Sequence, residues 1–177
     1  EKYRTTGQFP PVLSQYLLEQ HQWYPPLFPL LMAKLPEAIF EKYSQILAVF
    51  IDLFRLILLM VAAYWFTGRV NSAIAAGLVY SITPILIMYN VQLNPRGLGA
   101  LFLDIIVLLL VWLIWHDGMF LGWALVILLS GLVLLTHKMT TQLLWFSSLL
   151  SSIVFLDWRL FMLIPSSIIM AIILSKG

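Results

Sequence analysis

A segment near the middle of the chain carries a fixed cation among turn-forming residues. In the run from residue 90 to residue 99, Arg96 is followed by Gly97 and Gly99. The planar guanidinium of arginine matches phosphate oxygens, and glycine lets the backbone approach a ligand closely. This pattern favours a phosphate site, and the open alternative is a plain turn whose arginine reaches lipid headgroups.

A second polar segment, residues 136–142, has a denser set of donors. It supplies the imidazole of His137, the ammonium of Lys138, three threonine hydroxyls that include Thr140, and the amide of Gln142. A pyrophosphate or phosphodiester headgroup at a membrane surface would match this set. A wetted turn whose lysine binds anionic lipid is the alternative.

Three more charged residues lie inside apolar stretches, where charges are costly and mark candidate functional positions. Asp52 and Arg55 are three residues apart, so they share a helical face and can neutralise each other. The alternative role for this pair is ion or proton transport. Asp104 lies near the start of a later apolar stretch, and Arg96 is its candidate partner. Structural pairing and substrate binding are both open for Asp104.

The elements that must position these residues are membrane helices. Of the 177 residues, 62% are hydrophobic and only 10% are charged, against roughly 25% charged in soluble proteins. Mean hydropathy is +0.96. These values predict a polytopic membrane protein and exclude soluble enzyme folds. The absence of cysteine excludes thiolate chemistry, and three separated histidines predict no metal site. A net charge of +2 gives no indication of nucleic-acid binding.

The sequence predicts an all-α transmembrane bundle of about six spans, preceded by short juxtamembrane helices. Residues 1–45, with six prolines, form the interfacial segment, and residues 46–177 form the bundle. Short connectors force neighbouring spans to be antiparallel, so Arg96 and the His137–Lys138 segment should lie close together on one membrane face. Asp157 should cap the last helix. The expected spans lie near 46–66, 70–89, 98–115, 119–136, 142–156 and 160–175.

Three segments in order carry a resemblance to a known family. They are Tyr24-Pro25-Pro26-Leu27-Phe28, Asn94-Pro95-Arg96-Gly97-Leu98-Gly99 and Leu135-Thr136-His137-Lys138-Met139-Thr140-Thr141-Gln142. This ordered set resembles the membrane-embedded C-type glycosyltransferases, the superfamily of dolichyl-phosphate-mannose–protein mannosyltransferases and their prokaryotic relatives. The resemblance covers nearly the whole chain.

The resemblance implies a membrane enzyme that transfers a sugar from a polyprenyl-phosphate donor to a lipid, glycan or protein acceptor with inversion. The chain would be the N-terminal half of the membrane domain, and the catalytic acidic residue would lie upstream of Glu1. A divalent cation is consistent with the family. Membrane lipids and the donor lipid are the implied partners, other membrane subunits are an open class, and nucleic acid is not expected. The expected lipid-phosphate ligands are Tyr24, Arg96, His137, Lys138, Thr140 and Gln142.

The implied location is the plasma membrane of a prokaryote, as a multi-pass protein. The resemblance places residues 1–45, 90–97 and 137–141 outside the cell. The distribution of lysine and arginine by itself favours the reverse orientation. Two other functions stay open: a non-catalytic membrane subunit that serves as a scaffold, and a transporter built around Asp52 and Arg55.

Overall fold

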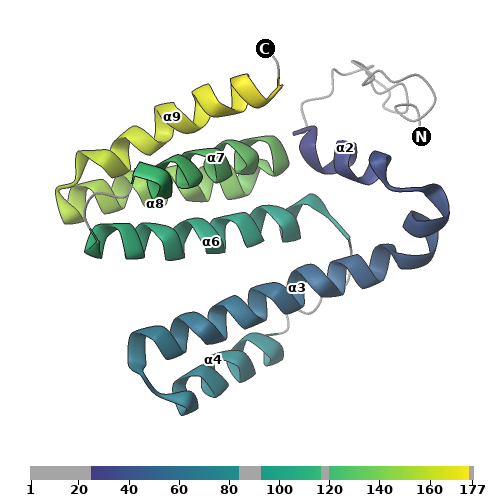
Figure 1. The fold of residues 1–177 in the computed structure, drawn as a ribbon, viewed down its shortest axis with the longest axis horizontal. Helices are drawn as coiled ribbons and strands as arrows, with labels where there is room; N and C mark the ends of the chain where they lie inside the picture. The colour runs from purple at the N-terminus through teal and green to yellow at the C-terminus, as the bar shows by residue number, and fades with distance from the viewer. Residues whose placement is uncertain (1–24, 84–92, 117–119, 176–177) are drawn as a thin grey trace.

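The structure, a computed structural model, describes residues 25–83, 93–116 and 120–175. Every regular element within these ranges is an α-helix, which confirms the predicted all-α class (Figure 1). The described helices are α2 (Leu27–Lys34), α3 (Glu37–Thr67), α4 (Val70–Ile82), α6 (Pro95–Trp115), α7 (Phe120–Thr136), α8 (Lys138–Phe155) and α9 (Trp158–Ser175).

Helix α3 is the longest of these, with 31 residues, and it starts at Glu37 instead of near residue 46. Pro36 adopts an extended conformation and separates α2 from α3. No proline occurs between Glu37 and Thr67, so none interrupts the helix. The helix ends at Gly68, which has a φ of 64° and donates its N–H to the Tyr64 carbonyl at 2.7 Å. Glycine adopts this left-handed conformation without steric cost.

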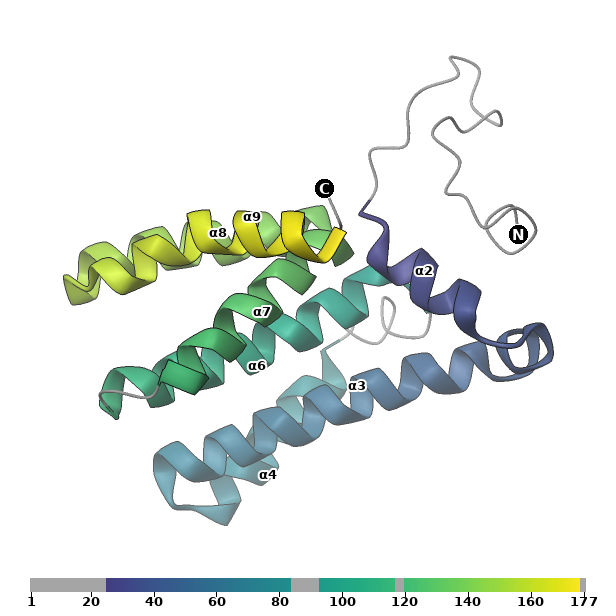
Figure 2. The same cartoon turned by 45° about the horizontal axis from the view of Figure 1, so that its top comes forward.

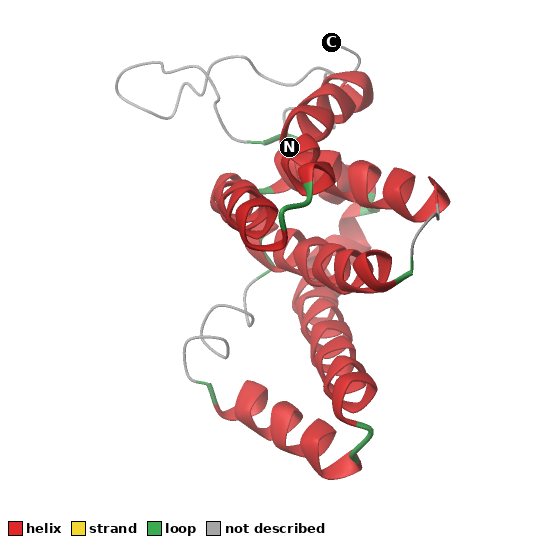
Figure 3. Ribbon diagram, turned by 90° about the vertical axis from the view of Figure 1, so that its left-hand side faces the viewer, coloured by secondary structure: helices red, strands yellow, loops and turns green. Residues whose placement is uncertain are grey.

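Helices α3 and α4 form an antiparallel hairpin, and α3 also packs against α6. Figure 3 shows this hairpin extending away from the other helices. α4 ends at Ile82, short of the predicted end at residue 89, and residues 84–89 lie outside the described ranges.

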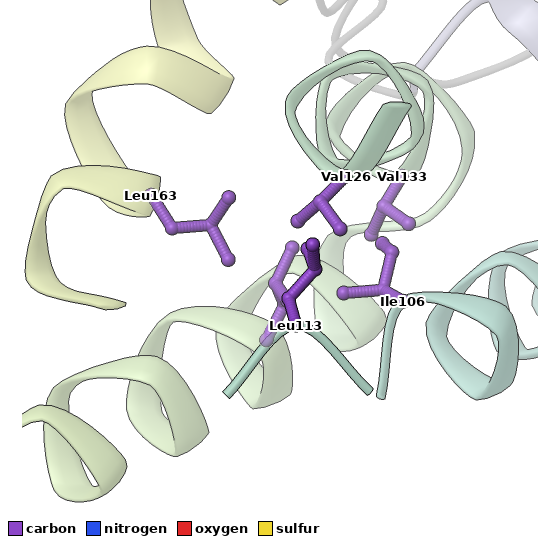
Figure 4. Close-up of a cluster of buried hydrophobic side chains, with 6 residues drawn as sticks. Ile106, Leu113, Val126, Val133 and Leu163 are labelled. Atoms are coloured by element: carbon purple, nitrogen blue, oxygen red, sulfur yellow. The ribbon is translucent and has the colours of Figure 1, made fainter. Parts of the chain in front are cut away.

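Helices α6, α7, α8 and α9 form the main bundle, with α7 in contact with the other three. Its centre is a cluster of six buried apolar side chains contributed by all four helices (Figure 4). At Gly131 of α7, an added Cβ would lie 2.7 Å from Met170 Cγ on α9. Close approach of helix backbones through small residues is a common way to pack helices in membranes. The cluster consists of Ile106, Leu113, Val126, Val133, Leu144 and Leu163.

The alternating directions of these helices bring particular helix ends together. The start of α6, the end of α7 and the start of α8 lie at one end of the bundle, near α2 (Figures 1 and 2). The α3–α4 turn and the α8–α9 turn lie at the opposite end. This arrangement agrees with the predicted antiparallel order, and it sets the positions of the polar residues described below.

Three described helices are long and apolar enough to cross a membrane: Lys42–Thr67 within α3, Pro95–Trp115 and Trp158–Ser175. α4 and α7 are apolar but shorter. Large apolar side chains are exposed along α3, among them Phe50, Phe54 and Val61. Such a surface suits a lipid environment, where exposed apolar side chains carry no penalty. The crossing count of six stays a prediction.

Candidate functional site

The first turn of α6 contains the candidate phosphate ligand Arg96. Asn94 caps the helix, because its Oδ1 accepts a hydrogen bond from the Gly97 N–H at 3.1 Å. Pro95 occupies the first helical position, which favours proline because its missing N–H is not needed there. Residues 95–97, predicted as the end of a connector, are therefore helical, and Arg96 is exposed at a helix N-terminus.

The second polar segment is also mostly helical, because His137 caps α8. Only His137 separates α7 from α8. Its ring Nδ1 accepts from the Thr140 N–H at 3.4 Å and lies 3.0 Å from Thr140 Oγ1. The Thr141 hydroxyl donates to the His137 carbonyl at 3.1 Å. The predicted connector between the spans 119–136 and 142–156 is thus reduced to one residue, and residues 138–141 belong to α8.

The starts of α6 and α8 are in direct contact through Gly99. A Cβ added at Gly99 would lie 3.1 Å from Thr140 Oγ1 and 3.2 Å from His137 Cβ. These separations are tighter than most real Cβ contacts, so a side chain at position 99 would require its neighbours to shift by a few tenths of an ångström. The structure thus brings the Arg96 turn and the His137–Lys138 segment together, as the sequence predicts.

His137 is 7% exposed, and its electrostatic environment keeps the imidazole neutral. Burial lowers the pKa of His137 below its ordinary value of 6.5, and the positive charge of Arg96 lowers it further. Because the Thr140 N–H can only donate, Nδ1 acts as the acceptor and the ring proton is on Nε2. The cap therefore fixes both the orientation and the tautomer of the ring, with Nε2–H as its donor.

The other predicted ligands divide into exposed and buried groups. Lys138 and Gln142 are exposed, and their separation of four residues puts them on one face of α8. Thr140 is 7% exposed, and its hydroxyl contacts the His137 ring. Thr140 therefore positions the imidazole. Tyr24 lies outside the described residues.

Helix α2 follows the Tyr-Pro-Pro segment and lies near this site. It contacts α6 and α7, and its Phe28 is 8% exposed. Pro26 occupies the position before the first helical residue. α2 lies at the end of the bundle where α6 and α8 begin (Figure 2).

Electrostatics favour an anion at the junction of α6 and α8. The N-terminus of a helix carries a partial positive charge and N–H groups without intrahelical acceptors. Two such termini meet here, and Arg96 and Lys138 add full positive charges on their first turns. A phosphate group has the charge and the acceptor oxygens to bind such a surface.

A second polar cluster lies on α3, α4 and α6. The Arg55 Nε donates to Asp104 Oδ2 at 2.7 Å, and the Tyr80 hydroxyl donates to Asp52 Oδ1 at 2.5 Å. The Arg55 guanidinium carbon is also 5.8 Å from the centre of the Tyr80 ring. Asp104 is therefore bonded to Arg55, whereas the sequence pointed to Arg96 as its candidate partner. The spacing of residues along one helix gave no signal for either cross-helix bond.

Comparisons with known proteins give no separate guide to the site. No family model matches the chain, and searches of curated proteins and of solved structures find no match either.

Proposed function

We propose that this chain is the N-terminal half of a membrane glycosyltransferase that takes its sugar from a polyprenyl-phosphate donor. In this proposal the phosphate of the donor binds where α6 and α8 begin. The observation that carries it is the packing of the α6 first turn on the His137 cap of α8, which places two helix N-termini together. The resemblance of the three ordered motifs supports the reaction class.

Each group has a defined part in binding the phosphate. Arg96 presents a planar pair of donors to two phosphate oxygens. Lys138 adds a second positive charge from the first turn of α8, and Gln142 adds an amide on the same helix face. His137 donates through Nε2–H without adding charge, because its ring is neutral at pH values near 7.

The bond that breaks joins the anomeric carbon of the sugar to a phosphate oxygen. As it breaks, the polyprenyl phosphate takes the electron pair and gains negative charge, which Arg96 and Lys138 stabilise. Groups held in place at a developing charge usually give the largest catalytic contribution. The acceptor hydroxyl attacks from the opposite side of the ring, and its proton passes to the acidic residue expected upstream of Glu1.

The family is consistent with a divalent cation, but the described residues contain no group of three histidine, aspartate or glutamate side chains that would hold one. The steps above are assigned to side chains alone.

The proposed orientation places the start of α6 and the start of α8 on the external face. Two crossings, by α6 and α7, separate Arg96 from Lys138 and would return them to the same side. Arg69 in the α3–α4 turn would then face the opposite side, so it serves as a control.

The test is turnover of a polyprenyl-phosphate sugar by purified full-length variants. We expect Arg96→Ala to lower turnover about 10²–10³-fold, the typical cost of losing one donor that stabilises developing charge. Arg96→Lys should restore only part of the activity, because lysine lacks the planar pair of donors. The control Arg69→Ala should change turnover by less than about fivefold, since an exposed charge contributes at most about 1 kcal/mol.

Equal activity of the wild type and Arg96→Ala would remove the phosphate role. In that case a scaffold role in a larger membrane complex would be the better reading. Loss of turnover in Arg69→Ala to the same extent as in Arg96→Ala would place the active site elsewhere.

A further inference from the structure

The second polar cluster borders a cavity that the proposed sugar transfer does not use. This cavity has a volume of about 420 Å³ and lies among α3, α4 and α6. Ligand pockets in proteins commonly have volumes of about 300–1,000 Å³. Apolar side chains form most of its walls, and polar groups gather at one part of the lining. The apolar residues are Leu58, Leu59, Ala62, Leu103, Val107 and Leu108, and the polar residues are Arg55, Tyr80 and Asp104.

The cavity is separate from the junction of α6 and α8. Near its start, α6 turns one face toward α3, where a Cβ added at Gly97 would lie 3.8 Å from Ile51 Cγ2. Gly99, two residues later, faces His137 and Thr140. Two positions that are two residues apart point in directions about 200° apart around a helix axis. The two polar clusters therefore lie on opposite sides of α6.

The polar part of the lining has unused hydrogen-bonding groups. Arg55 uses Nε for its bond to Asp104, and neither of its Nη groups is bonded within the described parts of the chain. The Arg55 side chain keeps only 13% of its accessible surface, against 37% for Asp104. Asp104 uses Oδ2 for the same bond, which leaves Oδ1 as an acceptor. A guanidinium donor and a carboxylate acceptor thus lie side by side at the edge of an apolar cavity.

These charges select against ionic ligands. An anionic headgroup would meet the carboxylate of Asp104, and Asp52 lies one helical turn from Arg55 on the same helix. A cationic headgroup would meet the Arg55 guanidinium. A neutral hydroxyl fits both groups, because it can accept from an Arg55 Nη and donate to Asp104 Oδ1. The apolar walls then suit a hydrocarbon chain attached to that hydroxyl.

We propose that this cavity binds an uncharged long-chain alcohol, such as a fatty or isoprenoid alcohol, with its hydroxyl between Arg55 and Asp104. The chain of the alcohol lies along Leu59, Ala62 and Val107. Ionisable residues among membrane helices are costly, and a ligand that uses their remaining hydrogen-bonding groups explains their position next to a cavity.

The test uses the full-length protein in phosphatidylcholine nanodiscs and a long-chain primary alcohol with a photoreactive diazirine at mid-chain. We expect labelled peptides from residues 55–62 of α3 and residues 103–108 of α6. Unlabelled alcohol should compete at least about tenfold better than the matched ionised carboxylate, which only accepts hydrogen bonds, or the matched alkane, which neither donates nor accepts. This competition series needs no variant and so does not depend on how a substitution folds.

Two variants test the position of the hydrocarbon chain of the alcohol. Ala62→Phe fills the apolar part of the cavity and should remove most of the labelling. Ala124→Phe, at an exposed alanine on α7, is the matched control and should leave labelling unchanged. Equal competition by the alkane would overturn the proposal, since the headgroup would then contribute nothing. Unchanged labelling in Ala62→Phe, or labelling confined to other helices, would overturn it as well.

Discussion

Replacing Gly99 with alanine tests whether contact between the starts of α6 and α8 builds the site. The added Cβ would lie 3.1 Å from Thr140 Oγ1 and 3.2 Å from His137 Cβ. Neither neighbour can move freely, because the Thr140 hydroxyl lies 3.0 Å from the His137 ring and both residues are buried. The substitution must therefore shift the two helix starts or the cap by a few tenths of an ångström.

Gly97→Ala is a matched control on the same turn of α6. Its added Cβ would meet Ile51 Cγ2 at 3.8 Å, an ordinary van der Waals separation. Both substitutions reduce the entropy of the unfolded chain, which stabilises a compatible site by about 0.4–1 kcal/mol. Overpacking costs about 1–3 kcal/mol, and it applies only to Gly99→Ala. Because the entropy term cancels between the variants, Gly99→Ala should be roughly 1–3 kcal/mol less stable than Gly97→Ala.

The assay is reversible unfolding of the purified full-length protein, for example by titration with a denaturing detergent. The measured quantity is the difference in the free energy of unfolding between the two variants. If Gly99→Ala were as stable as Gly97→Ala, the helix starts would not be held as closely as described. A phosphate site built on their contact would then lose its geometric basis.

Three further predictions concern the polar groups. The pKa of His137 is below its ordinary value of 6.5, so below about pH 6.5 unfolding takes up a proton and the free energy of unfolding should fall as the pH drops. His137→Gln, measured across the same pH range, should remove this contribution of His137 to the pH dependence of stability. Asp157→Ala should cost about 0.5–2 kcal/mol at neutral pH by removing the cap of α9. The hydrogen bond from Arg159 lowers the pKa of Asp157 below 3.8. The difference in the free energy of unfolding between Asp157→Ala and the wild type should therefore shrink only as the pH falls below 3.8. In a double-mutant cycle, Arg55→Gln and Asp104→Asn should show a coupling of about 0.5–3 kcal/mol, and additive losses in unfolding free energy would contradict their ion pair.

The helices follow from local features of the sequence. Helices α6, α7 and α9 begin and end within a few residues of the spans that the hydrophobic runs predict, because long apolar stretches in this chain have no other stable conformation. Asp157 caps α9 as predicted, since its Oδ1 accepts from the Arg159 N–H at 2.9 Å. Capping is a local interaction, so residue type and spacing suffice to predict it.

Other features depend on contacts between helices and were missed. The bond between Arg55 and Asp104 joins residues 49 positions apart, and the periodicity of a single helix carries no information on such a pair. The start of α8 was placed too late because His137 was interpreted as a ligand in a turn. Histidine is not among the preferred capping residues, and here the ring acts as the acceptor that serine or aspartate usually provides.

Helix α6 connects the two polar clusters, so a change at one cluster should affect the other. Gly99 and Asp104 are five residues apart on one continuous helix, a rise of about 7–8 Å. A helix moves largely as a rigid element over this length, so a shift forced at Gly99 will also displace Asp104 from Arg55. The Arg55–Asp104 coupling measured in a Gly99→Ala background should therefore be smaller than in the wild type, whereas a Gly97→Ala background should preserve it. An unchanged coupling would show that the contact of α6 with α8 and its ion pair with α3 are independent.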